Sequence, residues 1–140
     1  MPPFTGADPE ENVEPLVLIV DDNERGLKLA RDVLRAAGLR TLEAARGSEA
    51  VALAREDLPD VILMDLRLPD MDGTDAVRKL ADEERTAGIP VVVLSSLPLD
   101  EGADWFLAAG FVGYLEKPIS VREFPEQVRS YCTPRGAGRP

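Results

Sequence analysis

Four apolar runs in the sequence are each followed by polar residues that could bind a cation or take part in a reaction. Carboxylates gathered at one place repel each other unless a cation binds or one of them stays protonated. Oxygen donors with no thiolate or imidazole nearby favour Mg²⁺, which readily bridges to phosphate oxygens. A carboxylate in such a site could itself be a nucleophile and form an acyl phosphate. The residues concerned are Asp21-Asp22, Asp65, Ser95-Ser96 and Glu116-Lys117-Pro118.

The apolar runs before these residues are predicted to be strands of one parallel sheet. Continuous apolar runs of this kind are typical of strands that are buried on both faces. Because ligands bind beyond the carboxyl ends of strands in such sheets, the residues that follow the strands are expected to converge there. Strong strands are predicted at residues 16–20, 61–64 and 91–94, and weaker ones at 41–44 and 113–115.

Helical patterns fill the intervals between the strands. This fivefold (βα) alternation predicts an α/β architecture with helices on both faces of a parallel sheet. Ser48 is predicted to cap the second helix, and Ser120 with Glu123 forms a capping box for the last. Pro125 is expected to remove one ladder bond from that last helix. The helices are predicted at residues 24–37, after 48, at 74–85, 100–109 and near 121–131.

Length and composition indicate one folded domain between two tails. The chain has 140 residues, which suits a single domain. Residues 1–14 are rich in acids and prolines, and residues 133–140 contain mainly glycine, proline and arginine. Such compositions favour disorder, so the folded unit is expected at residues 15–132.

Charge and residue usage exclude several classes of function. The net charge of −10 makes the chain a poor binder of nucleic acid or of an anionic membrane. The chain has no histidine, which removes Ser-His-Asp and Cys-His catalysis and histidine metal sites. The single cysteine, Cys132, allows no intrachain disulfide and is expected to be an inert thiol. No address or apolar span is visible, so a cytoplasmic location is expected.

Taken in order along the chain, the polar residues at the strand ends form a known pattern. Asp21-Asp22, Asp65, Ser95 and Lys117-Pro118 follow the first, third, fourth and fifth predicted strands. This resembles the receiver domain of bacterial two-component response regulators, over about residues 15–132. Residues 111–120 are similar to single-domain, cell-cycle-type receivers. The resemblance implies a flavodoxin-like (βα)5 fold, a three-layer sandwich whose parallel five-stranded sheet has the order 2-1-3-4-5.

The resemblance also implies a metal site and a phosphoacceptor. Asp65 would be the nucleophile that accepts the phosphoryl group. Asp22 and Asp65 would bind Mg²⁺ directly, Asp21 chiefly through water, and the backbone carbonyl of Arg67 would complete the protein ligands. The side chain of Arg67, two residues after the acceptor, and Ser96, where alanine is usual, would alter how long the phosphoryl group survives.

Three further residues would carry the signal in such a receiver. Lys117 would pair with Asp65 and then with the phosphoryl group, and the Lys117-Pro118 bond is often cis in the family. Ser95 would bind a phosphoryl oxygen, and Tyr114 would change rotamer in concert with it. Each also has a simpler interpretation, since Lys117 could be a surface lysine, Ser95 could cap the segment that follows and Tyr114 could be a packed aromatic. Trp105 and Phe106 are expected to pack inward, with a partner surface as the alternative for Trp105.

As a receiver, the chain would be a switch and not a turnover enzyme, since it would catalyse only its own phosphotransfer and dephosphorylation. A histidine kinase or phosphotransfer protein would supply the phosphoryl group from its own histidine. A downstream protein or a second copy of the chain would bind the face formed by the fourth helix, fifth strand and fifth helix.

Other functions remain open at this point. The chain could be a receiver-like binding scaffold that works without phosphate, or a receiver fragment of a larger regulator. An aspartate-nucleophile phosphohydrolase would need a second aspartate at position 67, where the chain has arginine. A flavin site would need backbone donors in the loop after the first strand, where carboxylates stand instead.

Overall fold

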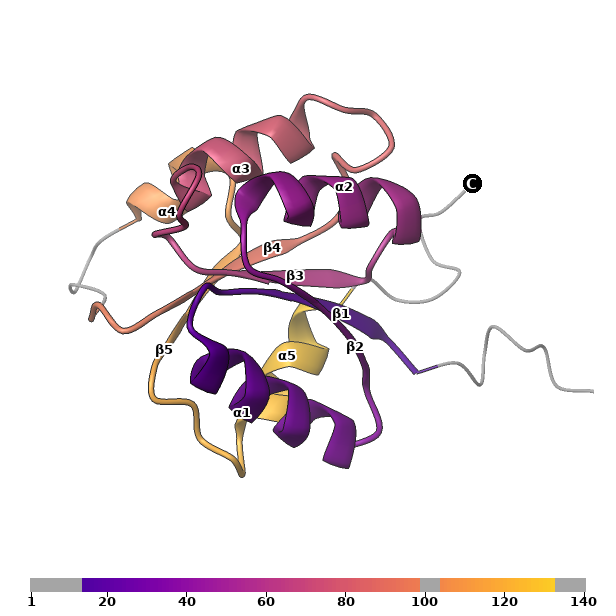
Figure 1. Ribbon diagram of the computed structural model, residues 1–140, viewed down its shortest axis with the longest axis vertical. Coiled ribbons are helices and arrows are strands. Elements are labelled where there is room, and N and C mark those ends of the chain that lie inside the picture. The colour runs from indigo at the N-terminus through magenta and orange to yellow at the C-terminus, as the bar shows by residue number, and fades with distance from the viewer. Residues whose placement is uncertain (1–13, 99–103, 133–140) are drawn as a thin grey trace, which may run out of the picture.

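The computed structural model describes residues 14–98 and 104–132, and within them strands and helices alternate along the chain (Figure 1). The β-strands are β1 (Leu16–Val20), β2 (Arg40–Ala44), β3 (Val61–Met64), β4 (Val91–Ser95) and β5 (Gly113–Glu116). The α-helices are α1 (Glu24–Ala36), α2 (Gly47–Asp57), α3 (Gly73–Ala81), α4 (Trp105–Ala109) and α5 (Phe124–Tyr131). None of the helices in these described ranges is long and apolar enough to cross a membrane.

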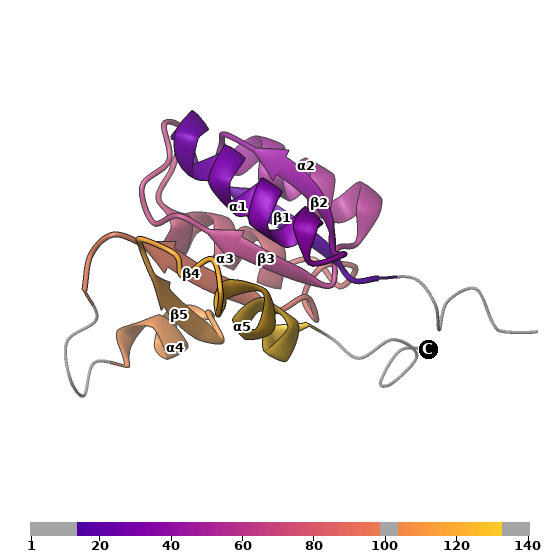
Figure 2. The ribbon, with the colours of Figure 1, turned by 90° about the horizontal axis from the view of Figure 1, so that it is seen from below.

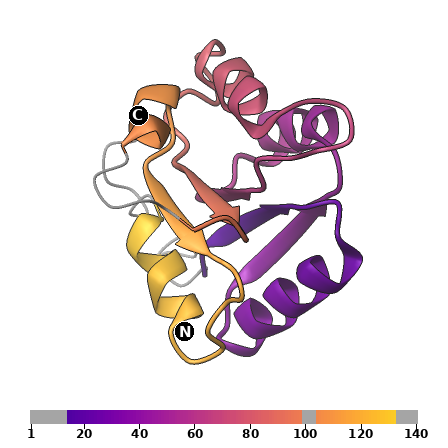
Figure 3. The ribbon, with the colours of Figure 1, turned by 90° about the vertical axis from the view of Figure 1, so that its left-hand side faces the viewer.

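The strands form one parallel sheet between two layers of helices. The strand order is β2-β1-β3-β4-β5, which confirms the predicted topology. Helices α1 and α5 lie side by side on one face of the sheet, and α2, α3 and α4 cover the other (Figures 1 and 2). After a quarter turn about the vertical axis of Figure 1, the sheet is seen to twist between these two layers (Figure 3).

The central strands are buried on both faces because helices cover both sides of the sheet. In β1, Val17 and Ile19 pack into the core under α1 and α5, whereas Leu18 and Val20 pack into the core under α2 and α3. The same alternation holds in β3, and every side chain of β3 is fully buried. This burial explains why both strands are continuous apolar runs with no polar position.

Helix α3 ends earlier than its sequence pattern predicts. Its last residue is Ala81, so the helix predicted at 74–85 is wrong beyond that position. The hydroxyl of the buried Thr86 donates to the carbonyl of Leu80 at 2.7 Å, and Glu83 pairs with Arg55 of α2. These two contacts, the first local and the second from α2, hold the chain in a turn where the apolar pattern alone favours further helix.

We expect Thr86→Val to lower the free energy of unfolding by about 0.5–1.5 kcal/mol, since it deletes this buried hydrogen bond while keeping the shape of the side chain. Thr74→Val, in the first turn of α3, is the matched control and should change stability by less than about 0.5 kcal/mol. Urea denaturation of both variants measures the difference. Equal stability of the two variants would show that the Thr86 contact does not hold this turn.

The starts of α2 and α5 also differ from the predictions. Ser48 lies inside α2 and is not its cap; the carboxylate of Asp70 accepts the hydrogen bonds of the first turn instead. In α5 the hydroxyl of Ser120 does accept from the backbone N–H of Glu123, at 3.2 Å. However, the helix begins only at Phe124, so Pro125 occupies a first-turn position where no ladder bond is lost.

The fourth helix and the chain ends lie partly outside the described residues. Of the helix predicted at 100–109, residues 100–103 are not described, and α4 starts at Trp105. The Trp105 side chain is 42% exposed, so the expectation that it packs inward is wrong, whereas Phe106 packs against the core.

The two predicted tails also lie outside the described residues, except Glu14, whose carboxylate accepts from Arg129 at 2.9 Å. Cys132 donates weakly to the carbonyl of Val128.

Candidate functional site

The pairing of β1 with β3 brings the aspartates together. Val20 and Met64 are partners in register, so the residues that follow them leave the sheet at the same edge. Backbone hydrogen bonds continue this pairing, because the N–H of Asp65 donates to the carbonyl of Val20 at 2.9 Å. Asp21 is held by the strand on the other side, where its N–H donates to the carbonyl of Ala44 at 3.0 Å.

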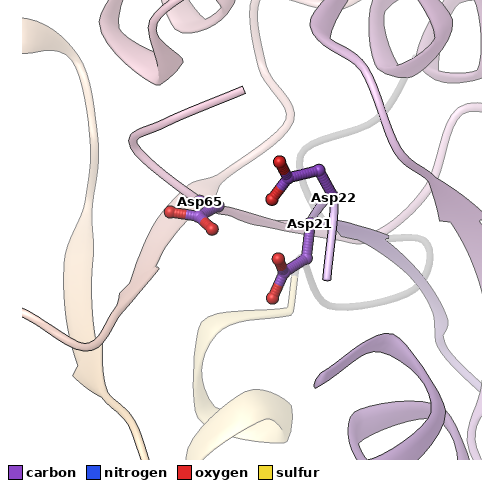
Figure 4. Close-up of side chains that lie close together, drawn as sticks. All are labelled: Asp21, Asp22 and Asp65. Carbon is purple, nitrogen blue, oxygen red and sulfur yellow. The ribbon is translucent and has the colours of Figure 1, made fainter. Parts of the chain in front are cut away.

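Three carboxylates converge at this edge of the sheet (Figure 4). Oxygen atoms of Asp21, Asp22 and Asp65 all lie within 4.8 Å of one another, which confirms their predicted convergence. They differ in their surroundings, since Asp21 is buried, Asp65 is partly buried and Asp22 is exposed. The site therefore combines a fixed inner carboxylate with two that are accessible from solvent.

Lys117 places a positive charge inside this cluster. Its Nζ lies 2.5 Å from Oδ2 of Asp21 and 3.7 Å from Oδ2 of Asp65, so its nearer partner is Asp21 and not the predicted Asp65. The other oxygen of Asp21 accepts from the backbone N–H of Asn23 at 2.9 Å. A buried carboxylate needs a paired charge more than a partly hydrated one does, which explains the preference of Lys117 for Asp21. The Lys117-Pro118 peptide is cis, as the resemblance implied.

Ser95 and Tyr114 are joined through a short segment after β4. Ser95 is the buried last residue of β4, and its carbonyl accepts from the backbone N–H of Lys117 at 2.8 Å. Its hydroxyl accepts from the N–H of Leu97 at 3.1 Å, which is the capping contact considered above. The hydroxyl of Tyr114 donates to the carbonyl of the same Leu97 at 2.5 Å. Leu97 thus connects both predicted switch residues.

These groups line one cleft of about 350 Å³. Arg67 and Ser96, the predicted modulators, are exposed residues in its wall. Glu116, which also stood among the strand-end residues, belongs to β5 itself and is exposed in register with Ser95. The lining residues are Asp21, Asp22, Asn23, Asp65, Leu66, Arg67, Ser95, Ser96, Leu97 and Lys117.

The electrostatics of the cleft centre on Asp65. Burial raises the pKa of its carboxyl, and the negative charge of Asp21 raises the pKa further. The backbone N–H of Arg67, which donates to Oδ1 at 3.2 Å, and the charge of Lys117 lower the pKa and only partly offset these effects. A divalent cation would relieve the repulsion, and the donors are all oxygens, so the residues present fit Mg²⁺.

Sequence reasoning missed two residues that shape the site. Gly73 packs directly on the main chain of Asp65, since a Cβ there would lie 2.6 Å from the carbonyl oxygen of Asp65. Asp70 fastens the loop after Asp65 to α2 through the contacts described above. Both belong to the Leu-Pro-Asp-Met-Asp-Gly segment at 68–73, which leads from the end of β3 into α3.

Comparison with known proteins agrees with this geometry. Residues 17–129 match the family described as the response regulator receiver domain. The chain is 40% identical to the polar-differentiation response regulator DivK of Brucella ovis over 115 residues, which cover 82% of this chain and 94% of that protein. The chain therefore belongs to the receiver domains of two-component response regulators, a family of signalling proteins.

Solved structures of receivers share the fold. The chemotaxis response regulator CheY4 of Vibrio cholerae superposes with a TM-score of 0.78 at 27% identity, covering 85% of this chain and 99% of that one. The receiver domain of a sensor histidine kinase from Pseudomonas aeruginosa gives a TM-score of 0.75 at 31% identity, covering 85% and 98%. That second structure has a magnesium ion coordinated in its active-site cleft.

We expect Asp65→Asn to raise the melting temperature of the metal-free protein at pH 7. The raised pKa means that the folded state holds the Asp65 proton more tightly than the unfolded chain does. Its contribution to stability is therefore complete below the unfolded pKa of about 3.9 and is lost as the pH rises through the higher folded value. Asparagine stays neutral throughout and avoids this loss.

Thermal denaturation in EDTA from pH 3 to pH 8 tests this expectation. The advantage of Asp65→Asn should be smallest at pH 3 and should grow until the wild-type carboxyl is ionised. Asp57→Asn, at the exposed end of α2, is the control for removing an acidic charge. An Asp65→Asn protein that is less stable than the wild type at pH 7 would contradict the assigned direction of the pKa shift.

Proposed function

We propose that this receiver accepts a phosphoryl group on Asp65 from the phosphohistidine of a histidine kinase or phosphotransfer protein. The observation that carries the proposal is the cluster of three carboxylates and one lysine around a single cleft. A carboxylate oxygen of Asp65 would attack phosphorus, and the P–N bond of the donor would break with its electron pair returning to the imidazole. The product is an acyl phosphate, and the protein acts as a switch and not as a turnover enzyme.

Mg²⁺ would be held by Asp22 and Asp65, by Asp21 chiefly through water, and by the carbonyl of Arg67. When bound, the cation would neutralise charge on the carboxylates and on the transferred phosphoryl group. Phosphoryl transfer depends mainly on such positioning and neutralisation. If the cation neutralises part of the charge of Asp21, Lys117 could turn toward the phosphoryl oxygens. Its Nζ already lies only 3.7 Å from Oδ2 of Asp65, the residue that would carry the phosphoryl group.

Ser95 and Tyr114 would carry the change from the cleft to the surface. If the hydroxyl of Ser95 binds a phosphoryl oxygen, it must leave the N–H of Leu97, and the carbonyl of Leu97 holds Tyr114. The ring of Tyr114 in turn lies edge-on to Trp105 of α4, with centroids 6.2 Å apart. The modification would therefore bias a two-state element that ends on the face of α4, β5 and α5.

That face is the proposed surface for a downstream protein or a second copy of the chain. It presents apolar side chains to solvent, since Trp105 is 42% exposed, Leu107 56% and Val112 47%. Tryptophan is enriched among residues that anchor interfaces. Arg67 and Ser96 at the cleft wall are proposed to set how quickly water or a donor reaches the acyl phosphate.

The acceptor is tested by intact mass after incubation with Mg²⁺ and phosphoramidate. We expect the wild type to gain about 80 Da, the mass of one phosphoryl group, and Asp65→Ala to gain nothing. Asp57→Ala is the control for loss of an unrelated aspartate and should react like the wild type. A folded wild-type protein that gains no mass would count against the proposal, and a failure to bind Mg²⁺ as well would favour the phosphate-independent scaffold.

The route to the surface is tested with Tyr114→Phe. This variant deletes the hydrogen bond to Leu97 but keeps the ring beside Trp105, which is the only tryptophan of the chain. We expect normal phosphorylation of the variant and a smaller change in Trp105 fluorescence on phosphorylation. Tyr131→Phe, in α5, is the matched control with a full response. Equal responses from both variants would show that the Tyr114 hydroxyl plays no part.

A further inference from the structure

Residues 66–72, between Asp65 and α3, form a loop that is fastened at its base to Asp65. The backbone N–H of Arg67 donates to the carboxylate of Asp65, and Arg67 forms an antiparallel bridge with Asp72. The N–H of Gly73 donates to the carbonyl of Leu66 at 2.7 Å. The loop is therefore a small closed hairpin, and the main chain of Arg67 lies on its acceptor side.

The tip of this loop is fastened to a different element, the start of α2. The carboxylate of Asp70 accepts from the backbone N–H of Gly47 at 2.8 Å and from that of Ser48 at 3.0 Å. These N–H groups belong to the first turn of a helix and have no partner within the helix. Arg46 occupies the N-cap position of α2, and within the described residues its side chain makes no capping hydrogen bond. The two N–H groups lower the pKa of Asp70, so it is ionised at neutral pH.

An apolar contact reinforces the same attachment. Met71 lies against the bare Cα of Gly47, where a Cβ would come within 2.5 Å of Cγ of Met71. A glycine at the start of α2 and an aspartate–methionine pair at the loop tip are thus matched to each other across more than 20 residues of sequence. The tip is held by one polar and one apolar contact, each of which can be broken separately.

We propose that Asp70 is a positioning residue for the cation site. By fixing the loop tip to α2, Asp70 holds the main chain of Arg67 where its carbonyl serves as a ligand. This inference rests on the proposed function, because it takes that carbonyl as a ligand of Mg²⁺. The ion demands nearly ideal octahedral geometry, so a loop free to move at its tip binds it less well. Groups that orient metal ligands typically contribute 10- to 100-fold to affinity.

Two simpler effects of Asp70 predict different results. If Asp70 acted only through its negative charge, then Asp72 in the same loop would matter as much. Within the part of the chain that the structure describes, the Asp72 side chain makes no cap hydrogen bond to α3. If Asp70 acted only by stabilising α2, then Gly47→Ala would be harmless or helpful, because alanine favours helix over glycine. The positioning role instead predicts damage from Gly47→Ala, which displaces Met71 without changing any charge.

Calorimetric titration of the full chain with Mg²⁺ separates these possibilities. We expect Asp70→Ala to weaken Mg²⁺ binding about tenfold, and Asp70→Asn, which keeps one acceptor oxygen, to weaken it less. Gly47→Ala should also weaken binding, whereas Asp72→Asn should stay close to the wild type. Equal losses in Asp70→Ala and Asp72→Asn, or wild-type affinity in Asp70→Ala, would overturn the inference.

Amide hydrogen exchange in EDTA provides a readout that does not need the cation. The N–H groups of Arg67 and Gly73 should exchange faster in Asp70→Ala and in Gly47→Ala than in the wild type or Asp72→Asn. If the wild type binds no Mg²⁺, the proposed function fails, and exchange alone then decides whether Asp70 anchors the loop. If the wild type binds Mg²⁺ but exchange at both groups is unchanged in Asp70→Ala, only the anchoring inference fails.

Discussion

Repulsion among three neighbouring carboxylates is the constraint around which the rest of this structure is arranged. Asp21, Asp22 and Asp65 have oxygens within 4.8 Å of one another, and one of them is buried. Such a group is tolerated only with compensating charge. Lys117 supplies part of that charge by pairing with the buried Asp21, and a cation would supply the remainder. The repulsion that Lys117 does not offset therefore destabilises the folded protein, and it lies where cation binding and phosphoryl chemistry are proposed.

The fold keeps these charges together by placing the site on its most rigid part. β1 and β3 are central strands, and the apolar side chains on both of their faces are buried. Backbone bonds from Asp21 and Asp65 to neighbouring strands extend that rigidity by one residue beyond the sheet. The parts expected to move lie farther out, at Ser96 and Leu97 after β4 and at the exposed Trp105 of α4. A stiff site for the proposed acceptor beside an adaptable surface is the arrangement that the proposed switch requires.

Much of the fold and the site could be predicted from the sequence because both depend on local pattern. Continuous apolar runs identified β1, β3 and β4, and the polar residues after them marked the edge at which the aspartates meet. Local pattern failed where a distant partner decides the outcome. The turn after α3 includes a pair between Glu83 and Arg55 of α2, and the cap of α2 comes from Asp70, far along the chain.

The sequence by itself determined the alternation of elements, the class of protein and the charged and hydroxyl residues of the cleft. Only the tertiary structure decided how those residues are paired. Lys117 contacts Asp21 more closely than Asp65, because the more deeply buried carboxylate has the greater need of a counter-charge. Trp105 stays exposed although its sequence position favoured burial, and Asp70 caps a helix to which it does not belong. Each of these outcomes depends on which surfaces meet when the layers pack, and periodicity along the chain carries no information about that.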